Sequence, residues 1–358
     1  MKKKSEGNRN IGLDLLRSVS MLMIVTLHYL AKGGFLWNTT PNTFLWYFVW
    51  FIEALCLISV NCYVLISAYF LTDSKQVKMK KVIGLWAEML FYSVSISVIL
   101  ALAGVPLSIK DIMYTIFPFL TKSYWFINTY ILMYLLHPFI NKVVWSINKK
   151  EFQRLLIVLI IFFSLEQSIL PLPEMTLDET GGYGIIWFVV LYFVGAYIKR
   201  FEKERQFLSG KINCVIFFGS GILLLLSRTI LSNVLLKFGF DEKYADVWYS
   251  YNSIPVLLAS IAIFLIFLHV NVNHRGIRRL IIQIGGATLG VYLIHEQVKL
   301  NKIFWKDVLN VDKFYNSPMM ILNMIVIVIG VFGICILIEM LRSFIMKKMK
   351  EKFRKVES

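Results

Sequence analysis

The stretch IGLDLLRSVSMLMIVTLHYLA, residues 11–31, is an apolar run of membrane length that carries three ionisable side chains. An α-helix of about 20 apolar residues crosses the hydrocarbon core of a bilayer. Ionisable groups at the centre of such a helix cost roughly 2.5–3.5 kcal/mol each on insertion scales, so Asp14, Arg17 and His28 indicate a functional site. Arg17 and His28 lie on one helix face, about 16 Å apart. Asp14, one turn before Arg17, can pair with it.

The chain as a whole has the composition of a polytopic membrane protein. Of its 358 residues, 58% are hydrophobic, and a soluble protein of this length cannot bury that much apolar surface. We therefore expect an all-α fold, a membrane domain over 1–345 and a basic cytoplasmic tail over 346–358. About ten transmembrane helices are predicted, near residues 11–31, 43–71, 82–104, 124–147, 153–170, 183–201, 212–235, 251–270, 280–300 and 318–341.

The distribution of basic residues predicts how these helices are oriented. If the N-terminus, the even-numbered loops and the C-terminus share one side, that side holds 27 Lys and Arg residues and the other side holds 9. Cytoplasmic loops are enriched in such residues, so both termini are predicted to be cytoplasmic and the acidic loop 174–179 to be outside. The net charge of +16 is accounted for by these loops, and no nucleic-acid partner is expected.

Four segments, in order, resemble the motifs of acyltransferase family three, the membrane acyltransferases that O-acetylate bacterial surface polysaccharides. The first helix of that family carries an Arg or Lys, ten residues, then a His, as Arg17 and His28 do here. The other three segments are 60–70, then Trp125-Phe126 leading to 134–138, and 285–295 with its Tyr-Leu-x-His ending. The sequence of the segment from Trp125 onward is similar to the matching segment of capsule and teichoic-acid acetyltransferases.

The resemblance implies a multi-pass O-acetyltransferase in the bacterial cytoplasmic membrane. It would use acetyl-coenzyme A as donor, with no metal, and an envelope glycan or its lipid-linked precursor as acceptor. Some relatives append an extracellular esterase-like domain. This chain ends with the tenth helix, so we expect direct transfer to the acceptor, or to a separate extracytoplasmic protein. Membrane lipids are the other expected contact.

Each candidate site residue has a functional and a structural interpretation. His28 can act as a general base on a hydroxyl or transiently carry the acyl group; the alternative is an interfacial histidine bonded to a neighbour. Arg17 is expected to anchor the donor, and the alternative is a snorkelling arginine. Asp14 is expected to orient Arg17. Glu53, deep in the second span, either orients His28 or forms a structural pair.

The remaining candidates come from the resemblance and from charge. Lys78 and Lys81 follow the second span, where many relatives have Arg-x-x-Arg; lysine keeps the charge but loses bidentate phosphate geometry. We expect them to contribute to donor binding. Trp125, Tyr292 and His295 are expected to bind the acceptor at the outer face. A further buried cation, Arg228, is expected to pair with a carboxylate within the spans, namely Glu88, Glu166 or Glu339.

Two other functions fit part of this pattern. Charges within the membrane are also typical of a transporter or flippase for a lipid-linked sugar or small solute. The histidine of the first helix and the lack of an internal repeat favour the enzyme. Acylation of a small molecule, such as an amine, is a third possibility.

Overall fold

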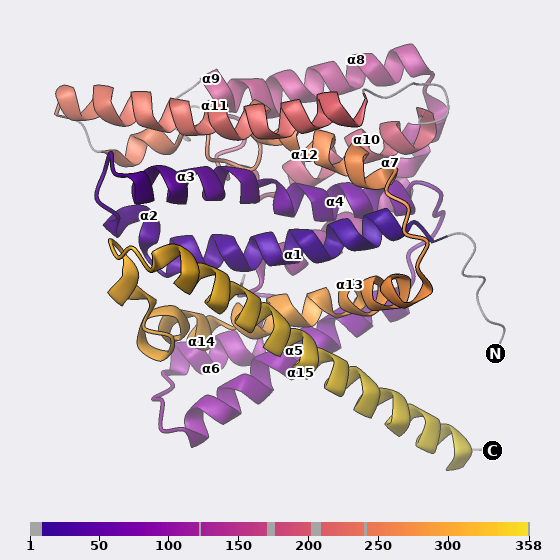
Figure 1. Ribbon diagram of the computed structural model, residues 1–358. Helices are drawn as coiled ribbons and strands as arrows, with labels where there is room; N and C mark the ends of the chain where they lie inside the picture. Colours follow the sequence, from indigo (N-terminus) through magenta and orange to yellow (C-terminus); the bar gives the residue numbers. More distant parts are fainter. Residues whose placement is uncertain (1–8, 122, 170–175, 202–208, 240–241, 357–358) are drawn as a thin grey trace.

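The computed structural model describes residues 9–121, 123–169, 176–201, 209–239 and 242–356, and it contains helices but no strands within these ranges. Figure 1 shows the long helices running roughly side by side. The α-helices are α1 (Ile11–Lys32), α2 (Phe35–Asn38), α3 (Phe44–Cys56), α4 (Ile58–Leu71), α5 (Met79–Leu102), α6 (Ile109–Ile116), α7 (Trp125–Ser146), α8 (Lys149–Ile160), α9 (Glu166–Ile169), α10 (Ile185–Phe201), α11 (Gly210–Lys237), α12 (Ile254–Leu268), α13 (Arg275–His295), α14 (Val298–Ile303) and α15 (Met320–Val356).

The all-α membrane architecture predicted from the sequence is confirmed. Every predicted run is helical over most of its described length. Seven helices in the described part of the chain are long and apolar enough to cross a membrane, with α3 and α4 counted as one span. The count of ten and the orientation remain predictions. Several residues that entered the orientation argument lie outside the described residues, namely Lys2–Lys4, Lys122, Lys203, Arg205 and residues 174–175.

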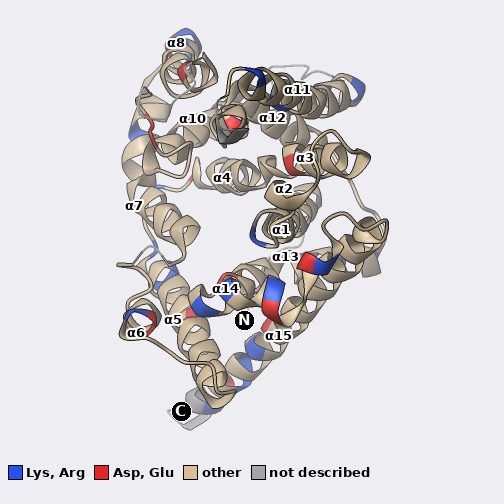
Figure 2. Ribbon diagram, turned by 90° about the vertical axis from the view of Figure 1, so that its left-hand side faces the viewer, with Lys and Arg blue, Asp and Glu red and all other residues tan. Residues whose placement is uncertain are grey.

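Helix α1 lies at the centre of the bundle and contacts α3, α4, α12, α13 and α15. Figure 2 shows it between the group that contains α4 and α12 and the group that contains α13 and α15. Two glycines permit this position. A Cβ on Gly12 would lie 1.9 Å from the carbonyl oxygen of Phe267 in α12, and one on Gly285 of α13 would lie 3.1 Å from that of Asp14. Of the ionisable groups of α1, Asp14 is buried, whereas Arg17 and His28 are partly buried.

The two ends of the bundle differ in what they hold. The last turns of α1 and α13 meet at one end, which we call the His28 end. The first turns of α7, α10 and α12 lie at the same end, because the residues just before them contact one another and α13. The first turn of α1 and the last turn of α15 lie at the opposite end (Figure 1).

A capping carboxylate fixes the connection between α5 and α7 at the His28 end. Ser108 caps α6 by a capping box with Asp111. The Lys299 Nζ of α14 lies 3.3 Å from Asp111 Oδ2. Hydrogen bonds from Ser108, assisted by Lys299, lower the pKa of Asp111 to about 2. This carboxylate is therefore charged at all physiological pH values and holds α6 against α14.

Candidate active site

His28 belongs to a chain of polar side chains at the His28 end. Its Nδ1 lies 2.8 Å from Nε2 of His295, the last residue of α13. The same Nδ1 lies 3.2 Å from Oε1 of Glu296, the next residue. Lys32, one turn after His28 on α1, forms an ion pair with Glu296. Two helices that are distant in sequence thus bring two imidazoles, a carboxylate and an ammonium together.

The hydrogen bonds determine which nitrogen of His28 is available as a base. His295 Nδ1 lies 2.5 Å from the carbonyl oxygen of Val291, which can only accept, so this nitrogen carries the proton. His295 Nε2 is then an acceptor, and His28 must donate to it through Nδ1–H. The lone pair of neutral His28 is left on Nε2, and no described group hydrogen-bonds to that atom.

Glu296 supplies negative charge behind His28. Burial raises the pKa of the Glu296 carboxyl, and the ammonium of Lys32 opposes part of that shift. Ligand atoms of His28, His295 and Glu296 lie within 4.8 Å of one another, a spacing that a metal ion could use. The ammonium of Lys32, which pairs with Glu296, places a positive charge where such a cation would sit. We therefore interpret the cluster as a hydrogen-bonded chain that orients His28.

A cavity of about 380 Å³ extends along α1 from Arg17 toward this cluster. It follows one face of α1 and the facing side of α13, and it stops one turn short of His28 and His295. The residues that line it are Arg17, Met21, Ile24, Tyr63, Ser67, Lys81, Leu85, Phe126, Ile127, Tyr130, Gly285, Gly286, Thr288, Leu289 and Tyr292. Most of these are apolar or aromatic, so the cavity suits a flexible, weakly polar chain with a charged group at the Arg17 end.

Two cations mark the end of this cavity away from His28. Arg17 Nη1 lies 3.1 Å from Asp14 Oδ1, so the pairing expected from their spacing is present. Arg9 also forms an ion pair with Asp14. Lys81 Nζ lies 2.9 Å from the hydroxyl of Tyr130 on α7. The structure therefore brings Arg17 and Lys81 to one cavity, whereas Lys78 does not line it.

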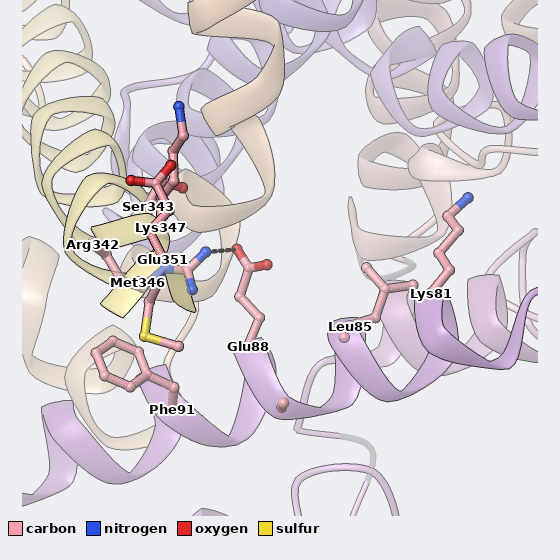
Figure 3. A pocket seen from close by; sticks show the side chains of 11 residues that line it. Lys81, Leu85, Glu88, Phe91, Arg342, Ser343, Met346, Lys347 and Glu351 are labelled. Atoms are coloured by element: carbon pink, nitrogen blue, oxygen red, sulfur yellow. Dashed lines mark ion pairs between the residues drawn. The ribbon is translucent and has the colours of Figure 1, made fainter. Parts of the chain in front are cut away.

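A second cavity of about 840 Å³ lies between α5 and α15 and shares Lys81 and Leu85 with the first. Figure 3 shows its lining, with Arg342 paired to Glu88 at 2.9 Å. Arg342 is also bonded to Glu339 through two nitrogens, each 2.7 Å from a carboxylate oxygen. Two carboxylates thus occupy its guanidinium, and Lys81 lies where the two cavities join.

The three residues expected at the acceptor mouth lie in different environments. Trp125 is half-buried and packs against Tyr183 and Tyr251, with ring centroids 4.5 and 6.0 Å away. Tyr292 is buried and lines the first cavity. His295 is fully buried behind His28. Both of these side chains lie inside the bundle, and acceptor binding by Tyr292 and His295 stays a prediction.

Glu53 is buried, as its position in the second span predicted, but it does not contact His28. The carboxylate beside His28 is Glu296. Glu53 instead lies near Asp246, at the end of a short 3₁₀-helix, η4 (Glu242–Asp246). Among the described residues no ion pair of Glu53 is present either, so its structural pairing and its catalytic role both stay predictions.

Arg228 pairs with a carboxylate that the sequence did not suggest. Its Nε lies 2.9 Å from Oδ1 of Asp246, and its guanidinium lies over the ring of Trp50, 4.3 Å from the centroid. The prediction of a partner within the spans was wrong because η4 folds back over the end of α11. Two of the expected partners, Glu88 and Glu339, bind Arg342 instead.

Sequence reasoning missed Glu296 and Lys32. Each had a signal: Glu296 directly follows the histidine of the fourth motif, and Lys32 lies one turn after His28. The contact between the ends of α1 and α13 could not be predicted from residue spacing.

A family model described as an acyltransferase domain matches residues 10–340. No curated protein and no solved structure matches the chain. The matched residues include the His28 cluster, the whole lining of the first cavity and all but the last turns of α15.

Proposed function

The chain belongs to acyltransferase family three, and we propose that it transfers an acetyl group from cytoplasmic acetyl-coenzyme A to a hydroxyl of an extracytoplasmic envelope glycan or its lipid-linked precursor. One observation carries the proposal. A single cavity leads from two cations, Arg17 and Lys81, to within one turn of a histidine with an available nitrogen. A donor with an anionic head and a long arm that ends in a reactive group fits this shape.

In this proposal the donor phosphates bind at the Arg17 end. The guanidinium of Arg17 can give two hydrogen bonds to one phosphate, and Lys81 adds a point charge. The larger cavity joins at Lys81 and has room for the nucleotide half. The pantetheine arm then lies along the apolar lining, and the thioester reaches the His28 end. Asp14 holds Arg17 in position.

The acceptor hydroxyl approaches His28 from the other side. His28 Nε2 takes the hydroxyl proton while the oxygen attacks the thioester carbon. The carbon–sulfur bond breaks, and the coenzyme A thiolate leaves with the proton that His28 took. His295 and Glu296 keep His28 in the required tautomer and balance the charge of the imidazolium. The rate gain comes from proton transfer and from positioning both reactants.

The proposed reaction requires the His28 end to face outward, and cysteine labelling tests this. In a background without Cys56, Cys62, Cys214 and Cys335, Leu177→Cys should react with a membrane-impermeant thiol reagent in intact cells, because Leu177 is exposed at the His28 end. Gln76→Cys, exposed between α4 and α5 at the other end, should react only after permeabilisation. The reverse pattern would overturn the orientation.

Glu296→Gln tests whether the chain of contacts orients His28. We expect kcat to fall roughly 10-fold to 100-fold, as for other groups that orient a functional side chain. The acidic limb of the pH–rate profile should also move to lower pH, because removal of a nearby carboxylate disfavours the imidazolium. Glu53→Gln should leave that limb in place. If Glu53→Gln moved the limb and Glu296→Gln did not, the assignment of Glu296 would be wrong.

Two assays test the proposal as a whole. Purified protein with acetyl-coenzyme A and an envelope glycan should release free coenzyme A thiol. NMR of envelope glycans from a deletion strain should lack O-acetyl signals. Lost export of a lipid-linked sugar, without any acetyl transfer, would favour the transporter; transfer to an amine would favour the small-molecule acyltransferase.

A further inference from the structure

The hydroxyl of Tyr292 is a buried polar group that the reaction as described leaves without a role. The side chain is 4% exposed and lines the first cavity at its His28 end. No described group accepts a hydrogen bond from the hydroxyl. A buried hydroxyl without an acceptor costs roughly 1–3 kcal/mol. Such a group at the closed end of a cavity indicates that a ligand supplies the missing acceptor.

The first turn of α7 lies beside the Tyr292 hydroxyl. The phenolic oxygen of Tyr292 faces the backbone N–H of Phe126. No side chain caps this helix end. The first backbone hydrogen bond of the helix runs from the N–H of Asn128 to the carbonyl oxygen of Tyr124, at 3.2 Å. Phe126 and Ile127 both line the cavity. A helix start with unpaired N–H groups carries a partial positive charge and favours an anionic oxygen beside it.

We propose that the Tyr292 hydroxyl and the first turn of α7 bind the carbonyl oxygen of the donor thioester and stabilise the negative charge it acquires during transfer. This inference rests on the proposed function and adds a catalytic residue to it. The placement agrees with the cluster behind it, because the rings of Tyr292 and His295 are 6.4 Å apart and His295 contacts His28. The carbonyl oxygen would face Tyr292 while the carbonyl carbon faces the hydroxyl that His28 activates.

The charge balance of the step is simple. As the acceptor oxygen bonds to the carbonyl carbon, the carbonyl π electrons move to its oxygen, which accepts a hydrogen bond from Tyr292 O–H. When the carbon–sulfur bond breaks, the double bond re-forms and the thiolate leaves. Tyr292 keeps its proton throughout, because His28 holds the proton that moves. The hydrogen bond is strongest when the oxygen is anionic, so it accelerates the step rather than merely binding the donor.

Tyr292→Phe tests the inference, because it removes only the hydroxyl and keeps the ring that packs on Phe126 and Tyr124. We expect kcat to fall roughly 100-fold to 1000-fold, the usual effect of removing one donor to such an oxygen. The affinity for acetyl-coenzyme A should fall by no more than roughly 10-fold, the effect of one neutral hydrogen bond to the bound donor. Tyr124→Phe is the matched control, since its hydroxyl already donates to the carbonyl oxygen of Leu293, at 3.1 Å. It should keep wild-type turnover.

Infrared spectroscopy gives a second measurement that a purely structural role would not affect. The carbonyl stretch of bound [1-¹³C]acetyl-coenzyme A should lie at lower frequency in the wild type than in solution. In Tyr292→Phe it should move back toward the solution value. A fully active Tyr292→Phe variant, or one that loses only donor affinity, would overturn the inference while leaving the acyltransferase intact. Wild-type protein that transfers no acetyl group would instead overturn the proposed function itself.

Discussion

His28→Ala should fold, reach the membrane and bind acetyl-coenzyme A, yet lose about 10²–10⁴-fold in transfer rate, or roughly 3–5 kcal/mol of barrier lowering. The reason is geometric. The only contacts of His28 in the described structure with other ionisable side chains are through Nδ1, with His295 and Glu296. Alanine would remove the base at Nε2 without touching Arg17 or the cavity lining.

The control for this variant is His269→Ala. His269 is exposed after α12, at the end of the bundle away from His28, and its ring bonds to the carbonyl oxygen of Leu265. It should retain wild-type specific activity. Wild-type activity should also fall on acidification, as His28 takes up a proton and can no longer act as a base. Full specific activity in a well-expressed His28→Ala variant would remove the main reason for preferring an acyltransferase to a transporter.

Arg17→Ala should abolish detectable activity through donor affinity. A charge-assisted hydrogen bond contributes about 1.5–3 kcal/mol, so the affinity for acetyl-coenzyme A should fall roughly 100-fold to 10,000-fold when both bonds of the guanidinium are lost. Arg17→Lys should lose most of the activity but bind better than Arg17→Ala, because lysine keeps the charge without the forked geometry. Isothermal titration with acetyl-coenzyme A would measure both affinities.

Arg275→Ala serves as the charge-matched control. Arg275 is exposed at the start of α13 and lines neither cavity. Its loss should leave donor affinity unchanged, which separates a specific phosphate contact from the general attraction of a basic surface. Unchanged binding of acetyl-coenzyme A to Arg17→Ala would remove Arg17 from donor binding.

Local spacing predicted what lies on one helix. The three-residue step from Asp14 to Arg17 predicted their ion pair, and the eleven-residue step from Arg17 to His28 predicted a shared face. Both follow from 3.6 residues per turn. The spans were predicted from the length of the apolar runs. The second predicted span is divided at Leu57 into α3 and α4, but the two helices together still form one apolar stretch of membrane length.

Contacts between helices could not be predicted in this way. Depth in the membrane correctly indicated that Glu53 is buried, but not that its neighbour is Asp246 rather than His28. His28 and Glu296 are 268 residues apart, and their meeting depends on how α1 packs against α13. Periodicity fixes which residues face inward and leaves open which helix they face.

An acetyl group should cross from a donor on one side of the membrane to a hydroxyl on the other. Proteoliposomes of uniform orientation test it directly, with [1-¹⁴C]acetyl-coenzyme A supplied only on the side of the chain termini and envelope glycan only on the His28 side. The account predicts alkali-labile label in the glycan and an equal amount of free thiol on the donor side. Thiol release without labelled glycan, or glycan labelled only when both reactants share one side, would contradict it.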